Sequence, residues 1–291
     1  MLSWQEATLL AGGLGVAGVL LIQAGQASGR AIRAWWWAVR AGSFLREAGV
    51  VVALYALWQL AGNLSTGGFQ GAMGHAWSIW RAERAAHLPS ELSVQRLLLP
   101  SPLLSQIANI YYATMHFGML IAMLIWLFAW HRERYPAVRN AVAASTAICL
   151  LISFFPVAPP RMLTSVGFVD LPARYTQSVY TTFGPIGADQ LSAMPSVHVA
   201  WAVLVAWAVI TIGTSRQRWL ILLHPVITVF VVVGTGNHFW ADGIVAAGIV
   251  AVVLTASAFV IRWAMMTRLP RRAGQISRGP LAHQAASRHR G

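Results

Sequence analysis

Long apolar runs separated by short polar stretches dominate the pattern of hydrophobic and polar positions along this chain. A hydrocarbon core about 30 Å thick needs about 20 mostly apolar residues in a helix, and seven runs approach this length. Arginine, glycine or proline bounds them, and they cover residues 7–29, 47–64, 105–130, 138–156, 195–213, 219–236 and 239–262. The pattern predicts an all-α integral membrane protein with seven spans.

The connections between these runs differ in character. Residues 65–104 hold tryptophan and leucine among charges, with a helix restart at Pro89 and Ser90, and predict two short interfacial helices. Residues 157–194 are rich in Pro, Gly and Thr and predict an ordered loop, whereas the Arg, Gly, Ser and Ala of the C-terminal tail predict disorder and attraction to anionic lipid. We expect an N-terminal span with its loop, a catalytic membrane domain and this basic tail, with bounds 1–46, 47–263 and 264–291.

Composition supports a membrane protein and narrows its function. Of the 291 residues, 57% are hydrophobic and 10% are charged, whereas a soluble domain carries about 25% charged residues. A net charge of +13 would suit a nucleic-acid-binding surface, but a mean hydropathy of +0.60 does not fit a solvated basic face. The single cysteine, Cys149, excludes a disulfide framework and a Cys-rich metal site. We expect lipid substrates in a membrane, no nucleic acid partner, and no metal or other cofactor.

The charges are distributed unequally between the two sides that seven spans define. One side carries 16 arginines and two glutamates, for +14, and the other carries five arginines and six acidic residues, for −1. Because basic connections stay in the cytoplasm, the first side is expected to be cytoplasmic. The topology is then that of a multi-pass cell membrane protein with its N-terminus outside and its C-terminus in the cytoplasm.

Ionisable residues near apolar spans are costly and indicate function, and here they gather on the outer side. Arg161, with the planar cationic fork that suits phosphate oxygens, follows the fourth span. His198 begins the fifth span, and His238 and Asp242 begin the seventh. The charge-derived topology places all of them at the outer face, although 37 and 40 residues separate them in sequence. We therefore expect one site at the outer membrane surface.

The residue types at this site suit phosphoryl transfer without a metal. His238 and Asp242 are spaced i, i+4, so the carboxylate can hold one ring nitrogen and leave the other free as a nucleophile or base. Pro195 suits the first turn of a helix, and Ser192 suits its cap. The free N–H groups of that turn would attract a phosphate beside His198.

The order Arg, Pro-Ser-x-His and His-x-x-x-Asp on successive helix starts resembles the type 2 phosphatidic acid phosphatase (PAP2) superfamily and, within it, the inositol phosphorylceramide synthase branch. The resemblance covers about residues 47–262 and implies the family's six-helix core, to which this chain adds one N-terminal span. It implies that His198 is the general acid, that His238 attacks phosphorus, and that Asp242 orients His238. The substrate phosphate is then expected to contact Arg161, Ser196 and Asn237.

The chain departs from the family pattern where the phosphatases carry two further cations. Phe154 stands seven residues before the motif arginine, in place of lysine, and Val232 stands six before the nucleophile, in place of arginine. Val197 and Met162 also replace a motif glycine and proline. A phosphomonoester carries about two negative charges near pH 7 and would need those cations, whereas a phosphodiester carries one. The departures favour a phosphodiester donor and a transferase, unless Arg174 or an interfacial arginine folds into the site.

Several alternatives stay open. His116 and Tyr112, in the third span, line a lipid cavity under the site or belong to the core, and Asn237 binds substrate or only caps. Arg161 has the alternative role of a headgroup-snorkelling arginine. The expected function is a phosphotransferase that moves a head-group phosphate, for instance inositol phosphate, to a lipid or glycolipid hydroxyl through a phosphohistidine. The alternatives are a lipid phosphate or polyprenyl phosphate phosphatase that uses water and, less favoured, a transporter.

Overall fold

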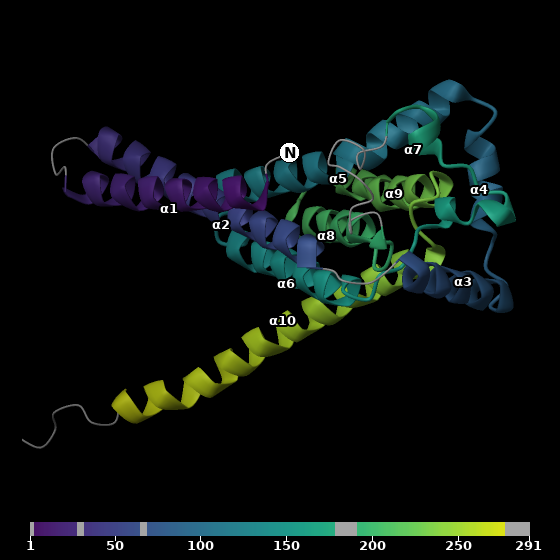
Figure 1. Cartoon of the computed structure of the whole chain (residues 1–291). Helices are drawn as coiled ribbons and strands as arrows, with labels where there is room; N and C mark the ends of the chain where they lie inside the picture. The colour runs from purple at the N-terminus through teal and green to yellow at the C-terminus, as the bar shows by residue number, and fades with distance from the viewer. Residues whose placement is uncertain (1–2, 28–31, 65–68, 178–190, 277–291) are drawn as a thin grey trace, which may run out of the picture. The chain divides into compact units, whose positions relative to one another are not determined.

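The computed structural model describes residues 3–27, 32–64, 69–177 and 191–276, which are helical apart from their connections and one isolated bridge. The chain divides into two compact units, residues 1–250 and 251–291. Figure 1 labels the α-helices. The elements follow in the order α1 (Trp4–Ala27), α2 (Ile32–Leu64), α3 (Phe69–Ala85), α4 (Glu91–Leu98), α5 (Pro102–Trp130), α6 (Tyr135–Ser153), η1 (Pro160–Met162), η2 (Thr164–Val166), α7 (Leu171–Arg174), α8 (Val197–Ile212), η5 (Arg216–Leu222), α9 (Leu223–Gly234) and α10 (Trp240–Ile276).

Five helical segments of the described residues are long and apolar enough to cross a membrane. They are Trp4–Gln26, Pro102–Trp130, Tyr135–Ser153, Arg216–Gly234 and Trp240–Val260. Each coincides with a predicted span, and α8, which matches the predicted span 195–213, is shorter but equally apolar. The predicted span 47–64 is the second half of α2, which is not among the five. The prediction of an all-helical membrane protein is therefore confirmed.

Helices α1 and α2 pack as an antiparallel pair at backbone contact distance (Figure 1). A Cβ built on Gly18 would lie 2.6 Å from the carbonyl oxygen of Gly42, and the reverse distance is also 2.6 Å. Gly49 approaches the carbonyl oxygen of Ala11 in the same way, at 2.9 Å. In a membrane the hydrophobic effect does not drive helices together, and small residues let the helix backbones approach closely enough for van der Waals packing. These glycines therefore allow the hairpin to form.

Helix α8 packs against α5, α6 and α9 and forms the core of the first unit. It is apolar on all sides, as expected of a buried helix, and its buried residues include Ala200, Ala202, Leu204, Val205, Ala206 and Ala208. Ser196 caps α8, since its hydroxyl accepts the Val199 N–H at 3.4 Å. The predicted cap at Ser192 and the predicted place of Pro195 in the first turn are wrong: Pro195 precedes the helix, and Ser192 belongs to the isolated bridge.

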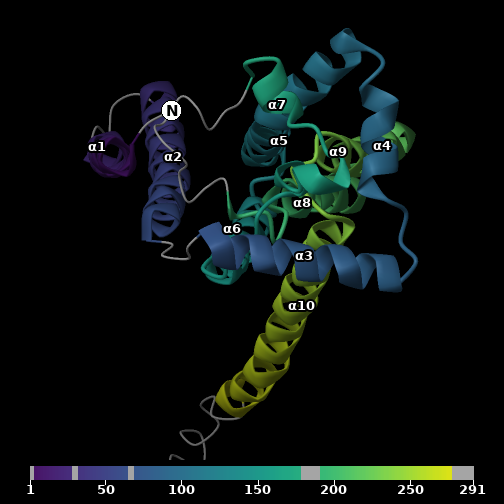
Figure 2. The ribbon, with the colours of Figure 1, turned by 45° about the vertical axis from the view of Figure 1, so that its right-hand side comes forward.

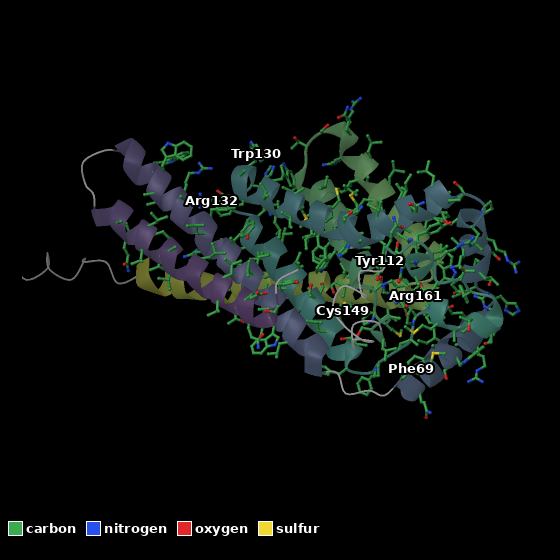
Figure 3. All side chains as sticks on the ribbon, turned by 45° about the horizontal axis from the view of Figure 1, so that its top comes forward. Phe69, Tyr112, Trp130, Arg132, Cys149 and Arg161 are labelled. Carbon is green, nitrogen blue, oxygen red and sulfur yellow. The ribbon has the colours of Figure 1, made fainter. Side chains whose placement is uncertain are left out.

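The segment 65–104 forms two short helices, α3 and α4, with the break at Pro89 and Ser90 as predicted, although residues 65–68 lie outside the described part. Ala72 and Ala76 of α3 join a buried apolar cluster with Phe239, so α3 lies across the start of α10 (Figure 2). Cys149 is buried on α6 (Figure 3).

Helix α10 continues to Ile276 and therefore runs past the boundary that we predicted between the membrane domain and the tail, at residues 263–264. Residue type does not explain the difference, since Pro270 and Gly274 of the same segment both disfavour a helix. The rest of the predicted tail, 277–291, lies outside the described residues.

Candidate active site

Backbone hydrogen bonds join the segments that carry the first two motifs, which are Arg161 and the Pro-Ser-x-His motif that ends at His198. The Val157 N–H donates to the carbonyl oxygen of Leu191 at 2.6 Å, and the Val157 carbonyl accepts the Ala193 N–H at 3.1 Å, which makes a parallel bridge. The Ala158 N–H donates to the carbonyl oxygen of Ala72 on α3 at 3.1 Å. Three segments that are distant in sequence are thus held together beside η1 and the start of α8.

The turn between α9 and α10 positions the third motif, His-x-x-x-Asp, which runs from His238 to Asp242. The Gly236 N–H donates to Val233 at 2.9 Å and the Asn237 N–H donates to Val232 at 3.0 Å, which are the paired bonds of a Schellman cap. Gly236 has a φ of 71°, in the left-handed region that favours glycine. Its carbonyl accepts the Arg161 N–H at 2.8 Å, so the cap connects the first motif to the third.

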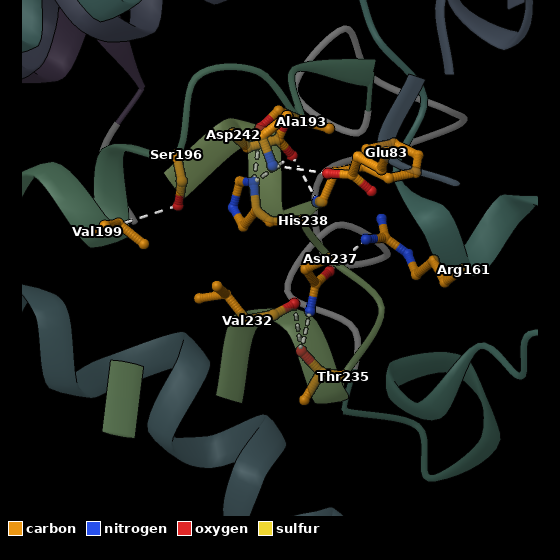
Figure 4. A network of polar contacts seen from close by, with 12 residues as sticks. Glu83, Arg161, Ala193, Ser196, Val199, Val232, Thr235, Asn237, His238 and Asp242 are labelled. Atoms are coloured by element: carbon orange, nitrogen blue, oxygen red, sulfur yellow. Dashed lines mark hydrogen bonds and ion pairs between the residues drawn. The ribbon is translucent and has the colours of Figure 1, made fainter. Parts of the chain in front are cut away.

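Arg161 is buried, with 3% of its surface exposed. Its Nη1 donates to Asn237 Oδ1, and its Nε lies 3.4 Å from Asp170 Oδ2. Asn237 is itself oriented, since its Nδ2 donates to Thr235 Oγ1 at 2.8 Å (Figure 4). A buried, oriented guanidinium is not a headgroup-snorkelling arginine, and Asn237 holds this guanidinium.

His238 is fixed through one ring nitrogen only. Its Nδ1 lies 2.6 Å from the carbonyl oxygen of Ala193 and 3.4 Å from Asp242 Oδ2 (Figure 4). Because a carbonyl oxygen can only accept, Nδ1 carries the proton and the lone pair of the neutral ring resides on Nε2. Nε2 is buried and has no hydrogen-bond partner among the described residues. The i, i+4 contact with Asp242 is as predicted, but the nearer partner of the ring is the carbonyl of Ala193.

Asp242 is fully buried and organises the start of α10. Its Oδ2 accepts the Phe239 N–H at 2.7 Å, as the third residue of a helix does in a capping box. Its carbonyl oxygen accepts the Ser196 N–H at 3.2 Å, which connects the starts of α8 and α10. A carboxylate beside His238 would stabilise the imidazolium that forms when Nε2 becomes bonded.

His198 lies in a column of rings in contact with the nucleophile candidate. Its ring stacks on Tyr112, with centroids 4.3 Å and planes 18° apart, and its centroid is 5.5 Å from that of His238. The ring centroid of His116 is 4.1 Å from that of His198 and 5.7 Å from that of Trp201. Both predicted cavity-lining residues therefore contact His198 directly.

Three site residues were missed by the sequence analysis, and all come from α3 and α4. Gln95 is fully buried and holds Val169 by both backbone groups at 2.9 Å, next to Asp170. Glu83, 3% exposed, accepts the Ala241 N–H at 2.7 Å, and Glu91 lies buried beside it. Their signal in the sequence is weak, because polar residues on short amphipathic helices normally face solvent.

The positions where the family carries additional cations stay apolar. Phe154 is 41% exposed and Val232 is 2% exposed. Arg174 is exposed and lies over the Tyr175 ring, 5.8 Å from its centroid, so it does not replace them. Among the side chains that the structure describes, Arg161 is the one buried arginine. Across the same residues, no group of three or more His, Cys, Asp or Glu side chains has the arrangement to hold a metal ion.

Comparison with known proteins gives one match. The family model of the PAP2 superfamily matches residues 77–258, which include Arg161 and both histidine motifs. No curated protein and no solved structure matches the chain.

Proposed function

The chain belongs to the PAP2 superfamily, and from this premise we propose that it is a membrane-embedded phosphotransferase that acts through a phosphohistidine on His238. Membership of this superfamily indicates lipid phosphatase or phosphotransferase chemistry in general. The observation that carries the finer proposal is the state of His238, whose Nδ1 is bonded while its buried Nε2 has no partner among the described residues.

The reaction proceeds in two displacements. The Nε2 lone pair of His238 attacks phosphorus, the bond from phosphorus to the leaving oxygen breaks, and His198 protonates that oxygen. Asp242 stabilises the imidazolium, while Arg161 and the first amides of α8 bind the phosphoryl oxygens. An acceptor hydroxyl, deprotonated by His198, then attacks phosphorus and releases His238.

The charge around His238 favours a singly charged donor. Arg161 is partly balanced by Asp170, at 3.4 Å, and Asp242 adds a negative charge on the other side of the ring. A phosphomonoester with about two negative charges would meet too little positive charge here, whereas a phosphodiester carries one. We infer a phosphodiester lipid donor, for which an inositol phospholipid is the first candidate. A phosphatase that uses water at the same site is the second candidate, since the superfamily includes both chemistries.

The unequal charges support an orientation of the site toward the outside of the cell membrane. The two sides predicted from the spans carry +14 and −1, and the starts of α8 and α10 belong to the less positive side. An N-terminal epitope tag that is inaccessible from outside intact cells would contradict this topology.

The function is tested with purified protein and phosphatidylinositol that carries ³²P in its phosphodiester, offered with a series of lipid and glycolipid alcohols. A new labelled lipid indicates transfer, and labelled inositol phosphate indicates hydrolysis. We expect an acid-labile phosphohistidine in the wild type and none in His238→Gln, with His131→Gln as the control at the end of α5. A folded wild type that forms neither product nor phosphohistidine overturns the proposal, as does an active His238→Gln protein.

A further inference from the structure

We propose that Glu83 is a positioning residue for the candidate nucleophile, because its carboxyl group caps the helix start that carries His238 and Asp242. The role in turnover rests on the proposed function, whereas the role in ordering the start of α10 does not.

The contact is made between two helices that are distant in sequence. Glu83 Oε1, on α3, accepts the Ala241 N–H of α10 at 2.7 Å (Figure 4). Ala241 is the second residue of α10, and its N–H has no partner inside the helix. Together with the bond from the Phe239 N–H to Asp242, Glu83 leaves two N–H groups of this helix start satisfied by carboxyl groups. The first turn of α10 is therefore stabilised by Asp242, from the same helix, and by Glu83, from α3.

Glu83 is itself held by a small charged cluster. Glu91 of α4 is fully buried beside it, and each carboxyl group keeps one buried oxygen, Glu83 Oε2 and Glu91 Oε1, without a hydrogen-bond partner among the described residues. Arg84 Nη2 lies 3.3 Å from Glu91 Oε2 and 3.9 Å from Glu83 Oε2, and it also donates to the carbonyl oxygen of Pro89 at 2.9 Å. Two carboxyl groups and one guanidinium are electrically neutral only when the pair shares one proton.

We assign the shared proton to Glu83 Oε2, the buried oxygen of this side chain that has no hydrogen-bond partner among the described residues. Burial, followed by the interaction with Glu91, raises the pKa of Glu83 to about 8. With Oε1 accepting from Ala241, a proton on the other oxygen of Glu83 can be donated to Glu91. Neutral Glu83 then accepts from α10 and donates to α4 at the same time. The charged groups that face the pair are Arg84 and, from α10, Asp242.

Loss of the shared proton would place two carboxylates side by side in a buried site, with Asp242 close by. Repulsion within the pair is costly where water is excluded, and moving Glu83 away breaks its bond to Ala241. The turn that carries His238 then loses its outer support. Displacements of about 1 Å around a reacting group cost about 100-fold in rate, so the effect is expected in kcat more than in KM.

Glutamine is the informative substitution, because its amide reproduces the neutral acid. In Glu83→Gln, the amide oxygen accepts from Ala241 and the amide nitrogen donates to Glu91. In Glu83→Ala, both bonds are lost. Glu133→Gln is the matched control, since Glu133 is exposed between α5 and α6.

Two measurements test the proposal on detergent-purified full chains. Hydrogen–deuterium exchange of the peptide that contains Ala241 is expected to rise in Glu83→Ala and to stay at the wild-type level in Glu83→Gln and Glu133→Gln. Turnover of labelled phosphatidylinositol is expected to fall about 10- to 100-fold in kcat in Glu83→Ala. We expect the wild type to lose activity above about pH 8, where Glu83 loses its proton, and we expect Glu83→Gln to retain turnover without this loss.

The outcomes separate the two proposals. A folded wild type that forms neither product nor phosphohistidine refutes the proposed function, and the exchange result still decides whether Glu83 supports α10. Unchanged exchange in Glu83→Ala refutes the positioning role, whatever the activity. If Glu83→Ala does not fold, the Glu83→Gln protein decides. The proposal is overturned if Glu83→Gln loses activity above about pH 8 as the wild type does, or if its activity is as low as that of His238→Gln.

Discussion

Replacement of Gly236 by alanine adds one carbon atom at the point where the first and third motifs meet. Gly236 has a φ of 71°, and a left-handed alanine costs about 1–2 kcal/mol. The added Cβ would lie 3.1 Å from the Arg161 Cβ and 3.2 Å from Gln95 Nε2. Carbon atoms in ordinary contact are about 3.5–4.0 Å apart, so Arg161 must move by about 0.5 Å.

This displacement reaches the guanidinium directly, because the Arg161 N–H is bonded to the Gly236 carbonyl at 2.8 Å. If about 1 Å costs about 100-fold in rate, then half that distance costs about tenfold. We therefore expect Gly236→Ala to lower kcat/KM about tenfold and to lower the melting temperature by about 2–6 °C.

The assay measures initial rates on labelled phosphatidylinositol at a range of concentrations, together with thermal unfolding in the same detergent. Gly118→Ala is the control, because a Cβ on Gly118 meets nothing within 4 Å. Gly236→Ala with wild-type kcat/KM and melting temperature would refute the reasoning that links the Schellman turn to Arg161.

Two further predictions concern the buried polar residues of α3 and α4. Gln95→Leu leaves both backbone groups of Val169 without their hydrogen bonds, at a cost of about 1–3 kcal/mol for each buried group. We expect a lower melting temperature, and a higher KM because Asp170, next to Val169, then holds Arg161 less firmly. An unchanged KM would contradict this. The second prediction concerns pH. The pKa of Glu83 is about 8 in the folded chain, against 4.5 for the free side chain. Between these two pH values the native state binds one proton more than the unfolded state. The free energy of unfolding therefore falls as pH rises through this window, by at most about 1.4 kcal/mol per pH unit. The melting temperature of the wild type should therefore fall more steeply from pH 5 to pH 8 than that of Glu83→Gln, and parallel curves would show that Glu83 is not the group responsible.

The membrane spans were predictable because a hydrocarbon core imposes a minimum length of apolar sequence. Helix ends were predicted less well, since they depend on local alternatives of similar energy. Ser192 and Ser196 are equally good caps by residue type, and the structure selects Ser196 because the segment around Ser192 is bonded to Val157. The continuation of α10 to Ile276 was missed because arginine-rich sequence is compatible with both helix and disorder.

Contacts in the candidate site were predictable where they join residues close in sequence, as for His238 and Asp242, although His238 precedes the first residue of α10. Contacts between segments were not. The carbonyl of Ala193 that orients His238, and the carboxyl group of Glu83 that caps α10, have no local pattern. A backbone carbonyl is present at every residue, so only the tertiary structure tells which of them faces the imidazole.

The parallel bridge at Val157 has a consequence for redesign of the site. Its bonds to Leu191 and Ala193, and the bond from Ala158 to Ala72, use main-chain atoms only. Side chains at these positions pack in the apolar cluster around Phe239 without taking part in the hydrogen bonds. These bonds therefore do not depend on residue type, and a library of apolar substitutions of similar volume can reshape the surroundings for a new acceptor while the motifs stay in register.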